Sequence, residues 1–217
     1  FAIKAIASSL TMRGFQLLSG GADGQPAILL QSGSLTVVDC VFGENTAGAL
    51  VVIDANVSIT NTWFAYNSAP LFGAGLHIAI HVAPQLSVVL NGLHCLENQV
   101  TPVFEPWSEA ARASAGGCVF IGASSDSAPV QSAALVLCIS SSTFVNNRVL
   151  WRYQELRANT ELTLSGGAVA IDTRFLSSVD VDIAYSWFTG NLATGRGNAT
   201  CELQGSRRLM APFAYGG

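Results

Sequence analysis

The stretch Ser34-Leu-Thr-Val-Val-Asp-Cys-Val-Phe-Gly-Glu-Asn45 decides the fold, because variants of it recur along the chain. It alternates apolar and polar residues, as a half-buried β-strand does, and places Phe42 three residues before Asn45. Every later copy keeps this offset. A weaker copy comes first, with Leu17 in the Phe position and Gly20 in place of the Asn, so that about six copies are present. The Phe column is Phe42, Phe64, Cys95, Phe144 and Phe188, and the Asn column is Asn45, Asn67, Asn98, Asn147 and Asn191.

Two further apolar columns precede the Phe column within each copy. They stand seven and five residues before it, and comprise Leu35, Val57, Val88, Leu137 and Val181, then Val37, Ile59, Leu90, Ile139 and Ile183. An additional apolar segment lies ahead of each copy and predicts a second strand, separated from the first by turns such as Gln31–Ser34 and Asp54–Asn56. Its predicted inward columns are Ile28, Val51, Ile78, Val119 and Val169, and Leu30, Ile53, Ile80, Ile121 and Ile171.

A repeat of two short strands cannot bury its own apolar face, but it can when stacked on copies of itself. Like residues then lie on like residues. The sequence therefore predicts an all-β chain, a parallel β-helix of about six coils, with the Phe column stacked inside. The asparagines would form an amide ladder at a bend, or, in the simpler alternative, each would be only a turn residue.

The alternating Phe-x-x-Asn and Gly-Gly-Ala-hydrophobic motifs resemble the repeats of chlamydial-type polymorphic outer-membrane proteins, within the pectin-lyase-like right-handed parallel β-helix superfamily. The motifs are seen at Phe42/Asn45, Phe64/Asn67, Phe144/Asn147 and Phe188/Asn191, and at Gly116-Gly117 and Gly166-Gly167-Ala168-Val169. Cys95, Gly48-Ala49 and Gly75-Leu76 depart from them. The resemblance covers residues from about 5 to 191 and implies a right-handed helix in an extracellular or cell-surface setting, without implying an activity.

Composition narrows the possible functions. Charged residues make up 11 % of the chain, against about 25 % in an average protein, and the mean hydropathy is +0.42. No apolar run is long enough to predict a transmembrane span. The net charge of −4, with no basic stripe on the strands, argues against nucleic acid. The chain begins at Phe1 and is expected to be one segment, 1–217, of a larger protein.

The predicted outward positions of the second strands are also apolar. They are Leu50, Val52, Ala79, Phe120 and Ala170. Large exposed apolar surfaces mark interfaces, so we expect these columns to be covered by a partner chain or a neighbouring domain, unless the strand assignment has slipped by one residue.

The five cysteines do not predict a metal site, because no Cys-x-x-Cys occurs. Cys95 falls in the stacked column, where it can act as a small hydrophobic residue. An odd number leaves one cysteine unpaired or paired outside the segment. Two sequons, at Asn56 and Asn198, lie in predicted turns or loops and are candidate N-glycosylation sites in a secreted eukaryotic protein.

Three segments, 99–115, 148–165 and 192–217, interrupt the repeats. Each follows an Asn of the ladder, so they should leave the solenoid at one corner on neighbouring coils; the first includes a short helical patch over 108–113. They hold seven of the ten basic residues. Arginine with aromatic side chains suits a protein partner or a sugar; the simpler alternative is that the aromatics are lids over the solenoid. The candidate contact residues are Trp107, Arg112, Trp151, Arg152, Tyr153 and Arg157.

The sequence gives little support for an enzyme. Glycosidases need two carboxyl groups at a defined separation, and lyases need an acidic metal site with a base. The candidates are Asp180 and Asp182 on one face with Tyr185, and Asp54 beside His81, which is more typical of an edge hydrogen bond than of an acid–base pair. Asp172 lies further along that column, and His77 and His81 lack a third metal ligand. We therefore expect no cofactor and a non-catalytic structural or adhesive module that binds proteins or glycans, with a carbohydrate-active enzyme on the same fold as the alternative.

Overall fold

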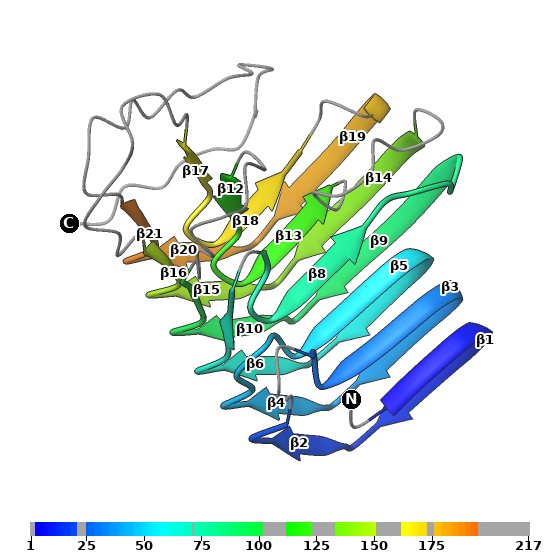
Figure 1. Ribbon diagram of the computed structural model, residues 1–217, viewed down its shortest axis with the longest axis horizontal. Coiled ribbons are helices and arrows are strands. Elements are labelled where there is room, and N and C mark those ends of the chain that lie inside the picture. The colour runs from blue at the N-terminus through cyan, green and yellow to red at the C-terminus, as the bar shows by residue number, and fades with distance from the viewer. Residues whose placement is uncertain are drawn as a thin grey trace.

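The computed structural model describes residues 3–20, 25–70, 72–101, 112–122, 133–150, 162–172 and 176–194. The regular secondary structure of these ranges consists of β-strands, and every strand pair is parallel (Figure 1). The strands stack in curled sheets, one level of the sequence repeat upon another. The fold is therefore all-β and solenoid-like, as the repeat predicts.

The largest sheet, sheet A, branches at one strand. The first half of β5 pairs with β8 and the second half with β9, so that one long strand is followed by pairs of shorter ones. This sheet contains β1 (Ile3–Arg13), β3 (Ile28–Val38), β5 (Leu50–Thr60), β8 (Leu76–Ala79), β9 (Gln85–Asn91), β13 (Val119–Gly122), β14 (Ala133–Ser140), β18 (Val169–Ile171) and β19 (Leu176–Ala184).

Three smaller sheets accompany sheet A, and they contain six, four and two strands. Sheet B carries the Phe column and consists of β2 (Gln16–Leu18), β4 (Val41–Gly43), β6 (Trp63–Ala65), β10 (His94–Leu96), β15 (Thr143–Val145) and β20 (Trp187–Thr189). Sheet C follows the Asn column and consists of β7 (Ser68–Ala69), β11 (Gln99–Val100), β16 (Arg148–Leu150) and β21 (Leu192–Thr194). The two-stranded sheet D pairs β12 (Arg112–Ala115) with β17 (Leu162–Ser165).

The Phe column is a direct stack along the interior. Phe42 pairs in register with Phe64, and Cys95 lies between Phe64 and Phe144. Phe42, Phe64 and Phe144 have no exposed surface. Phe188 stacks on Phe144 but is 44 % exposed, because β20 is the last strand of its sheet.

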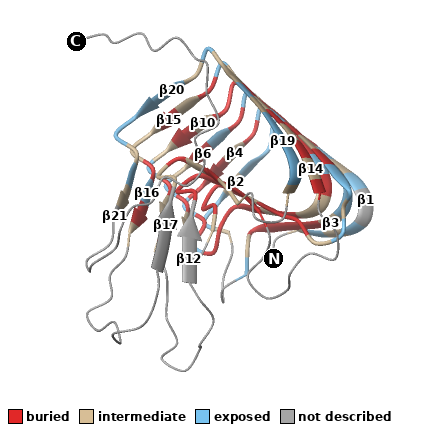
Figure 2. Cartoon of the chain, turned by 90° about the horizontal axis from the view of Figure 1, so that it is seen from above, coloured by how far each residue is buried: buried red, intermediate tan, exposed pale blue. Residues whose placement is uncertain are grey.

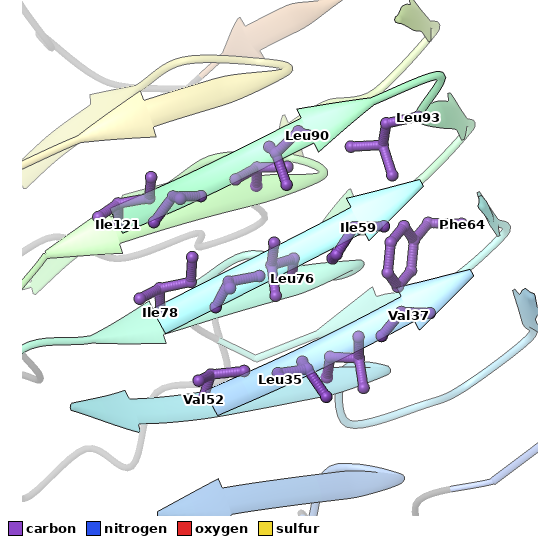
Figure 3. Packing of buried hydrophobic residues seen from close by; sticks show 14 of the residues in the cluster. Leu35, Val37, Val52, Ile59, Phe64, Leu76, Ile78, Leu90, Leu93 and Ile121 are labelled. Atoms are coloured by element: carbon purple, nitrogen blue, oxygen red, sulfur yellow. The ribbon is translucent and has the colours of Figure 1, made fainter. Parts of the chain in front are cut away.

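The two apolar columns that precede the Phe column are also in register. Leu35, Val57 and Val88 pair in succession, as do Val37 and Ile59, and all are buried. Figure 3 shows Leu35, Ile59, Leu90 and Phe64 among the side chains that fill the space between the sheets. The prediction of these columns is confirmed.

The predicted inward columns of the second strands are wrong in two places. In β5 they are shifted by one residue, onto the other face, and in β8 they are shifted by two residues along the same face. Leu50 and Val52 are fully buried, whereas Val51 and Ile53 are only partly buried. The run from Leu50 to Ile53 is apolar at every position, so period-two alternation cannot choose a face. The observed columns are Ile28, Leu50, Leu76, Val119 and Val169, and Leu30, Val52, Ile78, Ile121 and Ile171.

Left-handed backbone conformations mark the two ends of the sheet B strands. On the entry side Asp39 and Asn61 have φ of 55° and 47°, and on the exit side Glu44 and Tyr66 have φ of 56° and 57°. Positive φ at an aligned position in successive levels turns the chain sharply at each level, and Asp, Asn and Gly adopt it most readily. These two corners orient the outer face of sheet B and position the Asn column.

Three local predictions need correction. The bends near Ser32 and Asp54, with φ of 62° and 51°, lie inside continuous strands rather than between separate ones. The predicted helical patch 108–113 ends in strand β12, which begins at Arg112. The first residues of each predicted insertion belong to sheet C, because Gln99 pairs with Arg148 and Arg148 pairs with Leu192.

Candidate functional site

The asparagines form a hydrogen-bonded ladder along one corner of the stack. Asn67 Nδ2 donates to Asn98 Oδ1 at 2.9 Å, and the backbone N–H of Asn67 donates to the same oxygen at 3.2 Å. The second Nδ2 hydrogen reaches back to the Phe42 carbonyl at 3.0 Å. The same three contacts recur at Asn98 and Asn147, so each amide connects three consecutive levels. Asn45, Asn67, Asn98 and Asn147 are completely buried.

A disulfide replaces an aromatic ring in the middle of the stack. Cys95 and Cys118 are bonded, with their Cα atoms 6.1 Å apart. Cys118 stands one level above Gly75, at the same position of the repeat. Gly75 leaves no room for a side chain there, because an added Cβ would lie 3.0 Å from the Phe64 side chain and 2.9 Å from Cys118 Sγ. A Phe therefore packs against a small residue, whereas Cys95 meets a second cysteine. Cys95, which its column allows to be a small hydrophobic residue, is therefore one half of a disulfide.

The outer face of sheet B, which we call the aromatic face, is uncharged and carries exposed aromatic side chains. Its strands contain no Asp, Glu, Lys or Arg. Trp63 stacks on His94 with ring centroids 4.4 Å apart, and both side chains stand in the column that also contains Trp187. Trp63 is 45 % exposed, Trp187 63 % and Leu18 58 %. The aromatic face thus presents flat apolar rings beside single hydroxyl and imidazole groups.

The outer face of sheet A is covered differently. Phe120 lies in register with His77 and Ala170 and is only 3 % exposed, because Phe72 stacks on it at 4.4 Å. Ala79 and Ala170 are buried as well. The residues expected to be outward and covered by a partner are therefore either interior, as Leu50 and Val52 are, or buried by the chain itself.

His77 sits in this covered patch with its ring 5.4 Å from those of Phe72 and Phe120. Its Nε2 is buried and has no hydrogen-bond partner. Burial, with a smaller contribution from His81, lowers the pKa of His77 from 6.5 to about 4. Among the described residues no three His, Cys, Asp or Glu side chains are grouped to hold a metal ion.

The acidic candidates are separated on the structure. Asp54 Oδ1 accepts hydrogen bonds from the backbone N–H groups of residues 81, 82 and 83 at 2.8–3.1 Å, and these three contacts hold a turn. Asp180 and Asp182 are exposed on the outer face of β19, and their neighbours in register on β14 are Val136 and Cys138. Asp172 lies directly after β18, in the half of sheet A that continues β8 and β13, whereas Asp180 and Asp182 lie in the half that continues β9 and β14.

Most of the insertion residues proposed as contacts lie outside the described part of the chain. This applies to Trp107, Trp151, Arg152, Tyr153 and Arg157 and to the sequon residue Asn198, and Arg112 is described only in its backbone. Asn56 is exposed within β5, where its Oδ1 accepts a hydrogen bond from the Ser87 N–H at 2.9 Å.

The aromatic face was missed at the sequence level, although a signal was present. The residue before each member of the Phe column must point outward if the Phe points inward. At that position stand Val41, Trp63, His94, Thr143 and Trp187.

Comparisons with family models, with curated proteins and with solved structures found no match. Within the described ranges, no helix is long and apolar enough to cross a membrane.

Proposed function

We propose that this chain is a non-catalytic extracellular or cell-surface module, with a structural or adhesive role, that binds a protein partner or a glycan within a larger assembly. Its fold would be a right-handed parallel β-helix of about six coils, similar to chlamydial-type polymorphic outer-membrane protein repeats. The observation that carries the proposal is the aromatic face, where Trp63 and Trp187 are exposed on a sheet without charged side chains.

The chemistry of the aromatic face suits recognition. Tryptophan is enriched at binding hot spots, because it contributes a large apolar area while its indole N–H remains able to bond. The Trp63–His94 pair holds two rings nearly parallel, with 23° between their planes, so little side-chain entropy is lost when a partner packs on them. Planar rings of this kind suit either a protein side chain or the apolar face of a sugar.

Two further observations support an extracellular setting. The Cys95–Cys118 disulfide is of a kind that persists in oxidising compartments. The sequon asparagine Asn56 is exposed on the outer side of β5, where a glycan can be attached without entering the interior. The insertion residues, including Trp151 and Arg152, remain candidate contacts in the same assembly.

The test is a pair of binding assays on the intact chain. The double substitution Trp63→Ala with Trp187→Ala should abolish binding to a glycan array or adhesion to intact cells, while circular dichroism shows an unchanged fold. Val82→Ala, which alters an equally exposed apolar side chain (57 %) in a turn beside sheet A, should leave binding intact. Unchanged binding of the double variant would refute the role of the aromatic face.

The enzyme alternative has its own readout. Release of new reducing ends or unsaturated products from a panel of polysaccharides would favour it, provided that the activity disappears in the variant Asp180→Asn with Asp182→Asn. Loss of adhesion without any turnover in the wild type supports the module.

A further inference from the structure

The outward column of the aromatic face is interrupted at one level. Trp63, His94, Thr143 and Trp187 lie in register on neighbouring strands, so Thr143 stands where another ring would continue the column. Figure 2 shows β6, β10, β15 and β20 side by side in this order. Because β10 and β20 are both described, the interruption lies within the column and not at an end of it.

The distance across the interruption corresponds to one missing ring. The rings of Trp63 and His94, in successive levels, lie 4.4 Å apart, and those stacked in the interior Phe column lie 4.6–5.1 Å apart. Two strand spacings separate the level of His94 from that of Trp187, or about 9.6 Å. A single ring placed over Thr143 would therefore lie at stacking distance from both neighbours.

The Thr143 hydroxyl is available to a ligand. Within the described part of the chain it has no hydrogen-bond partner, and it is not buried. Hydroxyl groups nearby are committed, since Thr62 Oγ1 donates to the Thr60 carbonyl at 2.9 Å and Ser142 Oγ donates to the Ser140 carbonyl at 2.7 Å. A ligand that covers Thr143 must supply a polar atom at its inner edge, because a covered hydroxyl without a partner is unfavourable.

Charge restricts the ligand further. The left-handed corner positions beside the aromatic face include Asp39, Glu44 and Glu97 but no Lys or Arg, and these carboxylates disfavour an anion. The corner positions at the level of Thr143 are Ser141 and Asn146, which offer no counter-ion to a cation. With no charged residue in the strands themselves, the face suits an uncharged ligand.

We propose that the level of Thr143, between His94 and Trp187, binds one uncharged pyranose residue of a glycan in the place of the missing ring. A pyranose with equatorial hydroxyl groups carries C–H groups on both faces, and these pack on the electron-rich faces of aromatic rings. Its edge carries hydroxyl groups, one of which bonds to the Thr143 hydroxyl. A phenyl side chain of a protein has matching faces but no polar edge. This inference rests on the proposed recognition role of the aromatic face and names its ligand class.

The experiment titrates the intact chain with a panel of neutral oligosaccharides, including β-linked oligomers of glucose and of N-acetylglucosamine, and with an oligogalacturonate as the anionic comparison. At least one neutral probe should bind by calorimetry with an affinity independent of salt, and the anionic probe should not bind. In nuclear magnetic resonance spectra the signals of His94, Thr143 and Trp187 should shift. The signals of Trp63 should shift little, because His94 stands between Trp63 and the bound sugar.

Matched protein variants locate the contact. Thr143→Val removes the hydroxyl and keeps the shape, so it should weaken binding about three- to tenfold. Thr143→Phe places a ring of the chain itself at the missing level and should abolish binding. The control Thr36→Val makes the same change on the outer face of sheet A and should leave the affinity unchanged. Circular dichroism checks that all three variants fold.

Unchanged affinity of Thr143→Phe, or no binding of any neutral probe to the wild type, would overturn the inference. Adhesion that survives enzymatic removal of glycans from the target cells, yet is lost in the Trp63 and Trp187 double variant, would identify a protein partner. The recognition role of the aromatic face would then stand, and the glycan site would be wrong. Adhesion that is retained in the double variant would instead refute the proposed function itself.

Discussion

The substitution Asn147→Ala tests how much the ladder contributes to stability. Asn147 Oδ1 accepts from the backbone N–H and from Nδ2 of Asn98, at 3.1 and 2.9 Å. Its Nδ2 donates to the Cys95 carbonyl at 3.1 Å and to Asn191 Oδ1 at 2.9 Å. Alanine removes all four hydrogen bonds and leaves the backbone contact from Asn147 to Asn191 in place.

The magnitude follows from the groups left behind. Three buried groups lose a partner: the Asn98 N–H, one Asn98 Nδ2 hydrogen and the Cys95 carbonyl. Each unsatisfied buried group costs about 1–3 kcal/mol, and partial relaxation reduces the sum. We expect the free energy of unfolding to fall by about 3–5 kcal/mol, a large part of the roughly 5–15 kcal/mol of a typical domain.

The assay is urea unfolding followed by far-ultraviolet circular dichroism. The matched control is Asn91→Ala, which removes one exposed hydrogen bond from the Ser140 hydroxyl and should cost under about 1 kcal/mol. The double variant Asn98→Ala with Asn147→Ala should cost less than the sum of its single substitutions, because each removes a partner of the other. A loss below about 1 kcal/mol for Asn147→Ala, or equal losses for Asn147 and Asn91, would refute the reasoning.

Three other predictions concern the stability of the fold. Phe144→Ala should lower the free energy of unfolding by about 3–5 kcal/mol in the same assay, because it opens a cavity in the middle of the stack; a neutral result would contradict the buried column. Replacing Cys95 and Cys118 by alanine removes a crosslink between residues 23 apart and should cost about 3 kcal/mol, whereas the pair Cys95→Phe with Cys118→Gly should recover part of it by restoring the Phe and small-residue pairing; equal stability of the two variants would contradict that pairing. Because the pKa of folded His77 is about 4 and the unfolded value is 6.5, the unfolded state binds more protons between these values, so stability should fall by up to about 3 kcal/mol as pH drops from about 6.5 to 4. His77→Leu should flatten this part of the pH profile of stability relative to wild type. Parallel profiles of the two proteins would show that another group causes the pH dependence.

The columns that could be predicted are those with a fixed offset and a distinctive residue type. Phe42 and Asn45 recur together at a fixed spacing. When an amide or an aromatic ring recurs at every level, the favourable arrangement is to stack it on the same residue type of the neighbouring level. The assignment of the inward residues in the second strands failed because Leu50 to Ile53 are all apolar. The apolar pattern is the same whichever of the two faces is placed inward. The parallel pairing of β5 with β3 and β8 distinguishes Leu50 from Val51.

The disulfide and the aromatic face depend on contacts between columns rather than within one. Cys95 replaces a Phe at the level where Cys118 replaces a small residue. The disulfide between them can be predicted only when both columns have been aligned. Trp63 and Trp187 stand in one column 124 positions apart in sequence, separated by residues of other types, so no local motif connects them. Phe72 covers Phe120 from a loop whose path the repeat does not predict.

The most direct test of the account is hydrogen exchange of asparagine side-chain amides, measured by nuclear magnetic resonance on the intact, isotope-labelled chain. The account places a continuous amide ladder in the interior. The Nδ2 hydrogens of Asn67, Asn98 and Asn147 should therefore exchange slowly, and those of the exposed Asn91 rapidly. Rapid exchange at all of these side chains would contradict the ladder and the stack built on it.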